Sequence, residues 1–309
     1  MTADGLAPSP SSSASRSLTP VGAWLMAIRP KTLTAAFVPV GVGTGLAFGM
    51  GVGRWLPALA ALGGALLIQI GTNLTNDYYD FKKGADTAER LGPTRVTQSG
   101  LIAPGKVLAG ALGCFALAIL SGIYLVTVGG WPIVAIGLSS VLFGYAYTGG
   151  PFPLAYHGLG DVFVFVFFGL VAVAGTYYVQ ALTVSPAAWW AAIPVGALGT
   201  ALLVVNNLRD VQTDAKAGKR TLVVRLGPSG GKAEYVLMLV AAYATPFLMF
   251  AGGLASAWVF LALLSAPFAV GPTRLVFGAQ GSALNSALGA TARLQLVFGL
   301  LFAVGLCLR

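Results

Sequence analysis

The sequence predicts an all-α membrane protein, a polytopic bundle of about nine transmembrane helices. Of its 309 residues 57% are hydrophobic and only 9% are charged, whereas a soluble domain usually carries about 25% charged residues. Apolar runs of roughly 20 residues, enough for a helix to cross the bilayer, recur along the chain. The runs are far longer than barrel strands and do not alternate. This composition excludes a soluble domain, a disordered chain and a disulfide scaffold.

The chain is expected to begin with a disordered tail, residues 1–20, which is rich in Ser, Pro and Ala and lacks the apolar region of a signal peptide. Residues 21–309 are expected to form one membrane-embedded domain. Its nine expected spans lie near 33–53, 56–79, 106–128, 131–148, 161–182, 186–207, 233–252, 254–274 and 290–308.

The charge distribution predicts the orientation of these spans. The chain has 18 Lys and Arg against 9 Asp and Glu, a formal net charge of +9. When the N-terminus is taken as cytoplasmic, all the Lys and Arg fall on that side except Arg54 and Arg309. We therefore expect a multi-pass protein of the inner membrane with a cytoplasmic N-terminus, and the basic balance does not indicate nucleic-acid binding.

The acidic residues gather in two places, at or just beyond the ends of the second and sixth spans. Six of the nine lie there: Asp77, Asp80, Asp86, Glu89, Asp210 and Asp214. Each place also holds Asn residues and a group of Lys and Arg. Because the two places lie four spans apart, they indicate two four-helix repeats followed by a ninth helix.

Helical spacing places the polar side chains of each cluster on one face. In the first cluster that face carries Asn73, Asn76, Asp77 and Asp80, which are three or four residues apart. In the second cluster it carries Asn206, Asp210 and Asp214, with Asn207 beside them. Gly84 and Gly218 are the expected C-terminal caps, after which the chain can turn its cations back toward the carboxylates.

Carboxylates grouped at the membrane boundary need a compensating cation. Oxygen ligands without His or Cys favour Mg²⁺, which is typically shared between carboxylates and substrate phosphates. The expected metal ligands are Asp77, Asp80, Asp210 and Asp214, with Lys83, Arg95, Lys219 and Arg220 neutralising a diphosphate. The amides of Asn73, Asn76, Asn206 and Asn207 are assigned to substrate binding. An ordinary solvated loop explains one Asp–Lys pair but not two matching faces.

The two clusters resemble the aspartate motifs of the UbiA superfamily of intramembrane prenyltransferases. The first motif is matched by Asn76-Asp77-x-x-Asp80 and Asp86, and the second by Asp210-x-x-x-Asp214 followed by Gly218-Lys219-Arg220. More specific stretches resemble the menaquinone branch of this superfamily; they begin at Arg29, Tyr147, Asp161, Gly175 and Asn206. Asp161 departs from the Glu expected there and is one methylene shorter.

The resemblance implies transfer of a polyprenyl group from its diphosphate to 1,4-dihydroxy-2-naphthoate, with release of diphosphate and CO₂. Asp86 is then either a helper of the metal or a proton acceptor. Arg29 or Lys31 engages the acceptor carboxylate, or both are topology anchors. Tyr147 stabilises an allylic cation, or belongs to an aromatic belt. Tyr177, Tyr178 and Gln180 are expected to line a tunnel for the prenyl chain.

Two other functions remain open at this point. One is prenyl transfer to another aromatic acceptor, such as homogentisate or 4-hydroxybenzoate, because the aspartate motifs are shared. The other is a transporter that uses the carboxylates as a translocation site. A transporter is expected to hold its ionisable residues near the bilayer midplane, whereas these lie at one membrane face. His157 is the single histidine and lacks partner ligands for a metal role.

Overall fold

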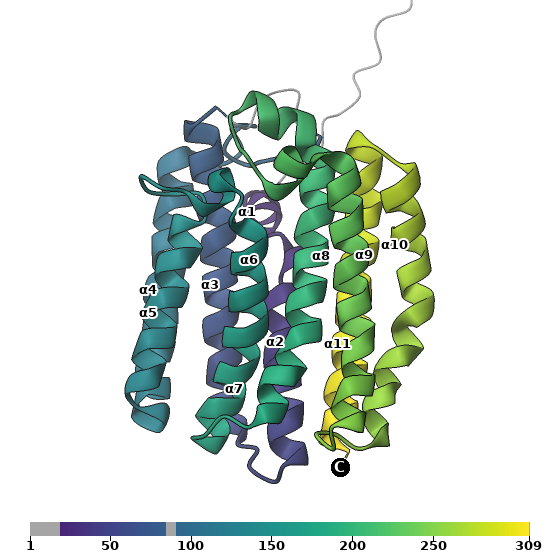
Figure 1. Ribbon diagram of the computed structural model, residues 1–309. Helices are drawn as coiled ribbons and strands as arrows, with labels where there is room; N and C mark the ends of the chain where they lie inside the picture. The colour runs from purple at the N-terminus through teal and green to yellow at the C-terminus, as the bar shows by residue number, and fades with distance from the viewer. Residues whose placement is uncertain (1–18, 85–90, 309) are drawn as a thin grey trace, which may run out of the picture.

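The computed structural model describes residues 19–84 and 91–308, and within these ranges every regular element is a helix. The long helices run side by side along one axis (Figure 1). The ends of α3 and α8, which carry the two acidic clusters, lie at the same end of the bundle. We call this the cation-rich end. The expected all-α fold is confirmed.

The elements follow the expected order. They are α1 (Pro20–Ile28), η1 (Pro30–Thr32), α2 (Thr34–Gly49), α3 (Trp55–Lys82), α4 (Pro104–Gly129), α5 (Trp131–Ala146), η2 (Leu154–His157), α6 (Gly160–Val164), η3 (Phe165–Val171), α7 (Ala172–Ala181), α8 (Pro186–Lys216), α9 (Leu222–Ala251), η4 (Ala257–Ser265), α10 (Ala266–Gly278), η5 (Gly281–Ala283) and α11 (Leu284–Cys307). The η3 segment is one π-helical stretch between α6 and α7.

Fewer helices than the nine expected are long and apolar enough to cross a membrane. Among the described residues, seven helices are long and apolar enough to cross a membrane. The bent pair Pro20–Thr32 and Thr34–Gly49 makes an eighth if it is counted as one span. Helix α5 has 16 residues, which is short of the roughly 20 that a bilayer requires. The division into two four-helix repeats stays a prediction.

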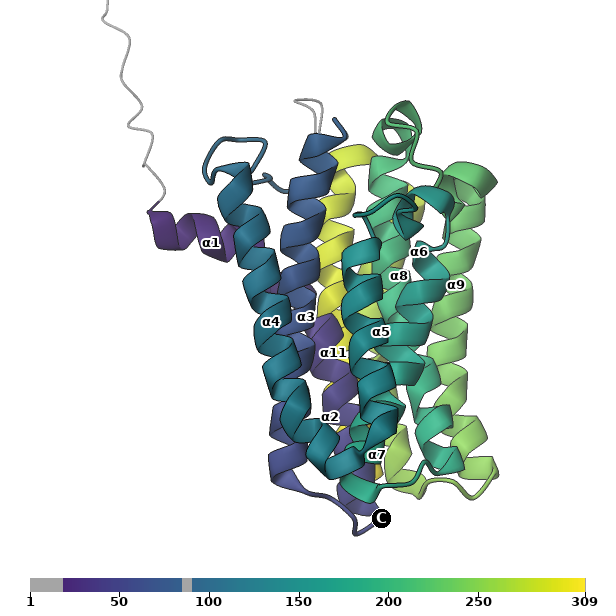
Figure 2. The same cartoon turned by 90° about the vertical axis from the view of Figure 1, so that its left-hand side faces the viewer.

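Helix α1 was not expected, and it lies across the bundle rather than along it (Figure 2). The two halves of the bent pair meet at 49°. Arg29 ends α1 in the left-handed region, with φ of 56°, and Pro30 follows. Because Pro cannot continue the hydrogen bonding of the preceding helix, the chain turns here before α2 enters the bundle.

Both motif helices run past the expected ends at 79 and 207. Helix α3 continues to Lys82 and α8 to Lys216, so Asp77, Asp80, Asp210 and Asp214 are part of these long helices. Polar residues do not end a helix, whereas Gly84 and Gly218 do, with φ of 69° and 72°. The two glycine caps are confirmed.

The starts of α9 and α11 also differ from the expected helix boundaries. Helix α9 begins at Leu222, eleven residues before the expected start at 233, and it kinks at Gly227, which has φ of 76°. Pro228 comes next and lacks a backbone N–H. The last helix, α11, begins at Leu284 rather than at 290.

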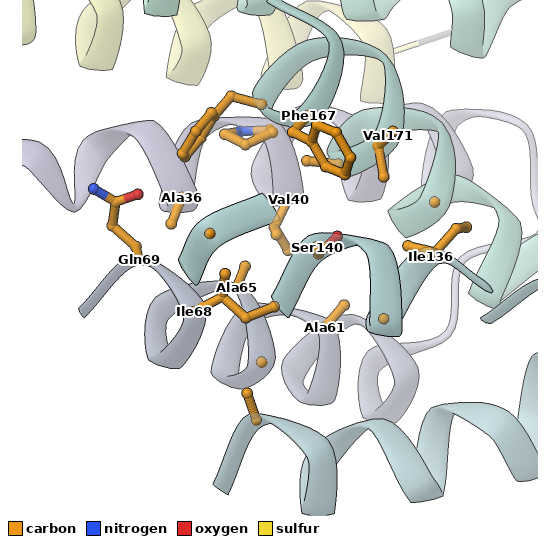
Figure 3. Close-up of a pocket in the computed structure, with 18 of the residues that line it drawn as sticks. Ala36, Val40, Ala61, Ala65, Ile68, Gln69, Ile136, Ser140, Phe167 and Val171 are labelled. Carbon is orange, nitrogen blue, oxygen red and sulfur yellow. The ribbon is translucent and has the colours of Figure 1, made fainter. Parts of the chain in front are cut away.

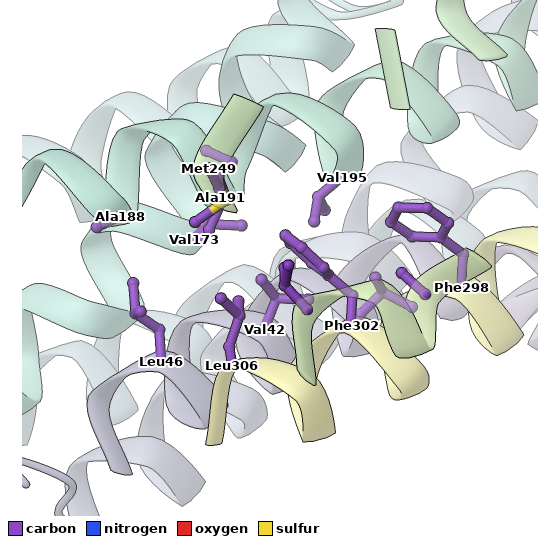
Figure 4. Close-up of a cluster of buried hydrophobic side chains, with 14 of the residues drawn as sticks. Val42, Leu46, Val173, Ala188, Ala191, Val195, Met249, Phe298, Phe302 and Leu306 are labelled. Carbon is purple, nitrogen blue, oxygen red and sulfur yellow. The ribbon is translucent and has the colours of Figure 1, made fainter. Parts of the chain in front are cut away.

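The largest buried core joins α2, α7, α8 and α11 with α9 and η4 (Figure 4). Val42, Phe298 and Phe302 are completely or almost completely buried in it. Small residues let the backbones approach closely, because a Cβ added at Gly45 or Gly49 would collide with backbone atoms of α11. These glycines therefore serve helix packing. The core fixes the helices whose other ends carry the site.

Candidate active site

The loop between α5 and α6 connects the two acidic clusters through Tyr156. The Tyr156 hydroxyl donates to Asp80 Oδ1 at 3.1 Å. Two cations lie near its ring, with Lys83 Nζ 4.5 Å and Lys219 Nζ 5.7 Å from the centroid. Lys219 Nζ in turn lies 3.7 Å from Asp214 Oδ1. Tyr156 was not predicted as a site residue. In the sequence it is a single aromatic residue in a Pro- and Gly-rich loop, and no motif marks it.

Asp80 lies at the centre of the first cluster. It is 4% exposed, and Arg95 Nη2 donates to its Oδ2 at 3.1 Å. Lys83 Nζ donates to the Thr148 carbonyl at 2.7 Å, and partial burial lowers the pKa of this lysine. The expected association of Asp80, Lys83 and Arg95 is therefore present in the structure.

Asp77 has a different environment from Asp80. Its carboxylate is 1% exposed and accepts from the backbone N–H groups of Val96 and Thr97, at 3.3 and 3.0 Å. The nearest Arg29 nitrogen lies 4.0 Å away. Since Asp77 ties the turn before α4 to α3, its geometry favours a structural role over the expected metal ligation.

Asn73 also holds the fold together. Its side-chain nitrogen donates to the Ile28 carbonyl at 2.8 Å and to Thr32 Oγ1 at 2.9 Å. These bonds attach the turn between α1 and α2 to α3, so they favour anchoring over direct substrate binding. Asn76 accepts a hydrogen bond of 2.6 Å from Thr148 Oγ1 and thereby orients the loop that carries Tyr147 and Tyr156.

The second cluster is organised by Arg209. Its guanidinium donates to both oxygens of Asp210, at 2.8 and 2.5 Å, and to Asn206 Oδ1 at 2.8 Å. It also donates to Asn285 of α11. Both Asp210 oxygens keep further lone pairs for a metal. Asn207 is buried beside this cluster. Arg209, which the sequence analysis had not assigned to the site, thus fixes Asp210 and Asn206.

Asp214 is linked to Asp80 through Lys219 and Tyr156. It is 8% exposed, and its Oδ2 has no hydrogen-bond partner. Arg220 is exposed, and its backbone N–H donates to the Tyr156 carbonyl. Asp86 lies outside the described residues.

The donor set fits a hard divalent cation at Asp80 and Asp214. Both side chains offer oxygen, and Asp214 Oδ2 is left over by the protein. No three Asp, Glu, His or Cys side chains within the described ranges form a metal-sized group, and Asp77 turns toward the backbone of residues 96–97. Metal ligation by Asp77, Asp80, Asp210 and Asp214 together stays a prediction.

Tyr147 directly follows the last residue of α5 and lines an apolar cavity. Burial and the negative charges of Asp161, Asp80 and Asp214 raise the pKa of its hydroxyl, so it stays protonated. Both oxygens of the buried Asp161 have no hydrogen-bond partner. His157 Nδ1 donates to the Pro153 carbonyl of its own loop, and the His157 ring stacks on Phe152. Lys31 is exposed next to the partly buried Arg29.

An apolar cavity descends from Tyr147 between α2, α3, α4, α5 and α6–α7 (Figure 3). Its empty space is about 1180 Å³, part of which is open to the surroundings. Along α5 it is lined from Tyr147 to Ile133, about 21 Å of helix rise. Ala, Val, Ile and Phe make up most of its wall.

The expected lining by Tyr177, Tyr178 and Gln180 is wrong. The neighbours Thr176 and Val179 line the cavity instead. The Tyr178 hydroxyl donates to the Gly129 carbonyl, and the Gln180 amide donates to the Thr176 carbonyl. The error is one of helix phase, because adjacent residues point about 100° apart.

Comparison with known proteins places these features in one family. The model of the UbiA prenyltransferase family matches residues 36–306. The chain is 40% identical over 280 residues to the 1,4-dihydroxy-2-naphthoate octaprenyltransferase of Mycobacterium tuberculosis, covering 90% of this chain and 94% of that protein. It is 39% identical over 293 residues to the enzyme of the same name from Escherichia coli, with 93% and 95% covered.

Solved structures share the fold at low sequence identity. A UbiA homologue from Aeropyrum pernix has a TM-score of 0.67 at 14% identity, covering 88% of this chain and 96% of its own. A UbiA homologue from Archaeoglobus fulgidus, solved with DMAPP and Mg²⁺, has a TM-score of 0.57 at 15% identity, with 91% and 99% covered. The chain is an integral membrane protein that belongs to the UbiA prenyltransferase family.

Proposed function

We propose that this protein transfers a polyprenyl group from its diphosphate to 1,4-dihydroxy-2-naphthoate, releasing diphosphate and CO₂. The observation that carries the proposal is the group of Asp80, Lys83, Lys219 and Asp214 around Tyr156, together with the long apolar cavity that begins at Tyr147. A cation-rich site suits the diphosphate, and the cavity suits the hydrocarbon chain. The naphthoate acceptor follows from the relatives of 40% and 39% identity that carry this activity in their names.

The charged residues at the cation-rich end and the apolar residues of the cavity have different roles in the proposed reaction. Asp80 and Asp214 would hold Mg²⁺, which when bound supplies charge neutralisation for the departing diphosphate. The phosphate oxygens are bound by Lys83, Lys219 and Arg95. The negative charge of the diphosphate thus meets the positive charge of these three side chains. Tyr156 keeps Asp80 in position through its hydroxyl. The apolar cavity below Tyr147 excludes water from the allylic carbon, so that the aromatic ring and not water attacks it.

We also propose the finer arrangement in the membrane. Helix α5 and the bent pair α1–α2 complete nine crossings, the acidic loops face the cytoplasm, and the host membrane is the inner one. The Lys and Arg distribution supports this, because Arg54 is the only described Lys or Arg away from the cation-rich end. Homogentisate and 4-hydroxybenzoate are alternative acceptors, since nothing in the acidic pair distinguishes among aromatic rings.

The test is an acceptor panel with purified protein. Detergent-solubilised enzyme, a prenyl diphosphate and Mg²⁺ are incubated separately with dihydroxynaphthoate, 4-hydroxybenzoate and homogentisate, and the prenylated products are quantified. We expect the highest kcat/KM with dihydroxynaphthoate. A preference for a monocyclic acid would refute the acceptor while leaving prenyl transfer intact. The Asp214→Asn variant is the control for product that does not depend on the site.

A further inference from the structure

The apolar cavity has one buried polar atom that the protein leaves unpaired. Gln69 of α3 lines the cavity and is 7% exposed, and its Oε1 has no hydrogen-bond partner. In Figure 3 its amide lies beside Ala36, at the opposite end of the lining from Ile136. A buried, unpaired amide oxygen is costly, which suggests that a ligand supplies the missing donor.

The orientation of the Gln69 amide follows from its neighbours. The Ile28 carbonyl can only accept, so the Asn73 atom 2.8 Å from it is nitrogen. The other Asn73 side-chain atom is then oxygen, and it accepts from Gln69 Nε2 at 3.3 Å. Gln69 Nε2 is therefore committed to Asn73, and Oε1 is the atom left for the cavity.

The depth of Gln69 restricts what can meet it. Gln69 precedes Asp80 by eleven residues on α3, about 16 Å of helix rise, which is too far for the diphosphate. A prenyl chain has no hydrogen-bond donor, and a carboxylate only accepts. Of the groups on the two substrates, only an aromatic hydroxyl can donate to Gln69 Oε1.

We propose that Gln69 determines acceptor specificity by accepting a hydrogen bond from one ring hydroxyl of the dihydroxynaphthoate. This inference rests on the proposed function and deepens it. The same bond sets the ring orientation, with that hydroxyl toward Gln69 and the carboxylate elsewhere. Arg29, which donates to the Asn73 carbonyl at 3.5 Å, lies at the cation-rich side of the same network. Asn73, expected to bind substrate, instead positions the residue that does.

The experiment removes the hydrogen bond between Gln69 and the ring hydroxyl in two ways, by changing the protein and by changing the substrate. Steady-state kinetics give KM for acceptor and donor in wild type and in Gln69→Met, which keeps side-chain volume. The two monohydroxy-2-naphthoates that lack either the 1- or the 4-hydroxyl are measured as competitive inhibitors. The matched control is Gln295→Met, since Gln295 is also buried with an unpaired amide atom but does not line the cavity.

We expect Gln69→Met to raise the acceptor KM about tenfold, the usual effect of one lost hydrogen bond, with donor KM unchanged. In wild type one inhibitor binds about tenfold more weakly than the other, and in Gln69→Met the two bind equally. Equal inhibition in wild type would overturn the inference even if the variant failed to fold. An equal change in Gln295→Met would also overturn it. Failure of wild type to use any naphthoate would instead refute the proposed function.

Discussion

Replacing Asp77 is expected to destabilise the protein, whereas replacing Asp214 is expected to stop its chemistry. Asp77 is 1% exposed and accepts two backbone hydrogen bonds, from Val96 and Thr97. Asp77→Ala leaves both N–H groups without a partner. At about 1–3 kcal/mol for each buried donor, the free energy of unfolding should fall by roughly 2–6 kcal/mol.

Asp77→Asn should fall between wild type and Asp77→Ala. An amide has a single acceptor oxygen, so it can satisfy one of the two N–H groups while its own NH₂ faces the other. The measurement is thermal unfolding in detergent, where roughly 2–4 °C is lost per kcal/mol in a large domain. Limited proteolysis within residues 91–103 provides a local readout of the released turn.

Asp214→Asn is the matched control for these variants. It removes a buried charge whose Oδ2 has no partner and whose Oδ1 lies 3.7 Å from Lys219, and because the gain from removing a buried charge offsets the loss of this contact, the melting temperature should fall little. The reasoning would be refuted if Asp77→Asn lost turnover at an unchanged melting temperature, because Asp77 would then act in the reaction and not in the fold.

Three further outcomes are expected. Asp214→Asn should lower turnover about a thousandfold, and excess EDTA should abolish wild-type turnover until Mg²⁺ is restored; full activity in EDTA would contradict the metal assignment. Tyr156→Phe should lower kcat about tenfold at constant melting temperature, because it removes one hydrogen bond to Asp80. Gly137 lines the cavity and has open space at its Cβ position, so Gly137→Phe should reduce kcat/KM for long prenyl diphosphates more than for short ones. Gly113→Phe, outside the cavity wall, should leave that ratio unchanged.

The sequence predicted the features that depend on local periodicity. Apolar run length located the membrane helices, and Gly84 and Gly218 marked where α3 and α8 end. Spacing of three and four residues correctly brought Asp80 and Asp77 near one another on α3. It could not show that the two side chains face different partners, since those partners, Arg95 and residues 96–97, come from a separate turn.

Features that depend on contacts distant in sequence were missed. Tyr156 meets Asp80 across 76 residues, and Arg209 meets Asn285 across another 76. No local pattern encodes such pairs. Gln69 was missed for a related reason, because a glutamine in an apolar run is typical of packing. Its role emerges only when Asn73 is seen to fix its amide and the cavity is seen beside it.

The cations of the site differ in how freely they can change partners when a diphosphate arrives. Arg209 is 2% exposed and donates to Asp210, Asn206 and Asn285 together. Moving it would break several buried hydrogen bonds at once, so it can serve only as a support. Lys219 contacts Asp214 at 3.7 Å, and a lysine ammonium on a flexible stem is easily redirected.

We infer that Lys219 and Lys83, which both lie near the Tyr156 ring, turn from carboxylate and carbonyl to phosphate oxygens, whereas Arg209 keeps Asp210 fixed. Such an exchange would leave no carboxylate unpaired if Asp80 and Asp214 held a divalent cation together with the diphosphate, because the cation would supply the charge that the lysines withdraw. The second acidic cluster therefore combines one immobile arginine, which preserves its geometry, with one mobile lysine, which follows the substrate.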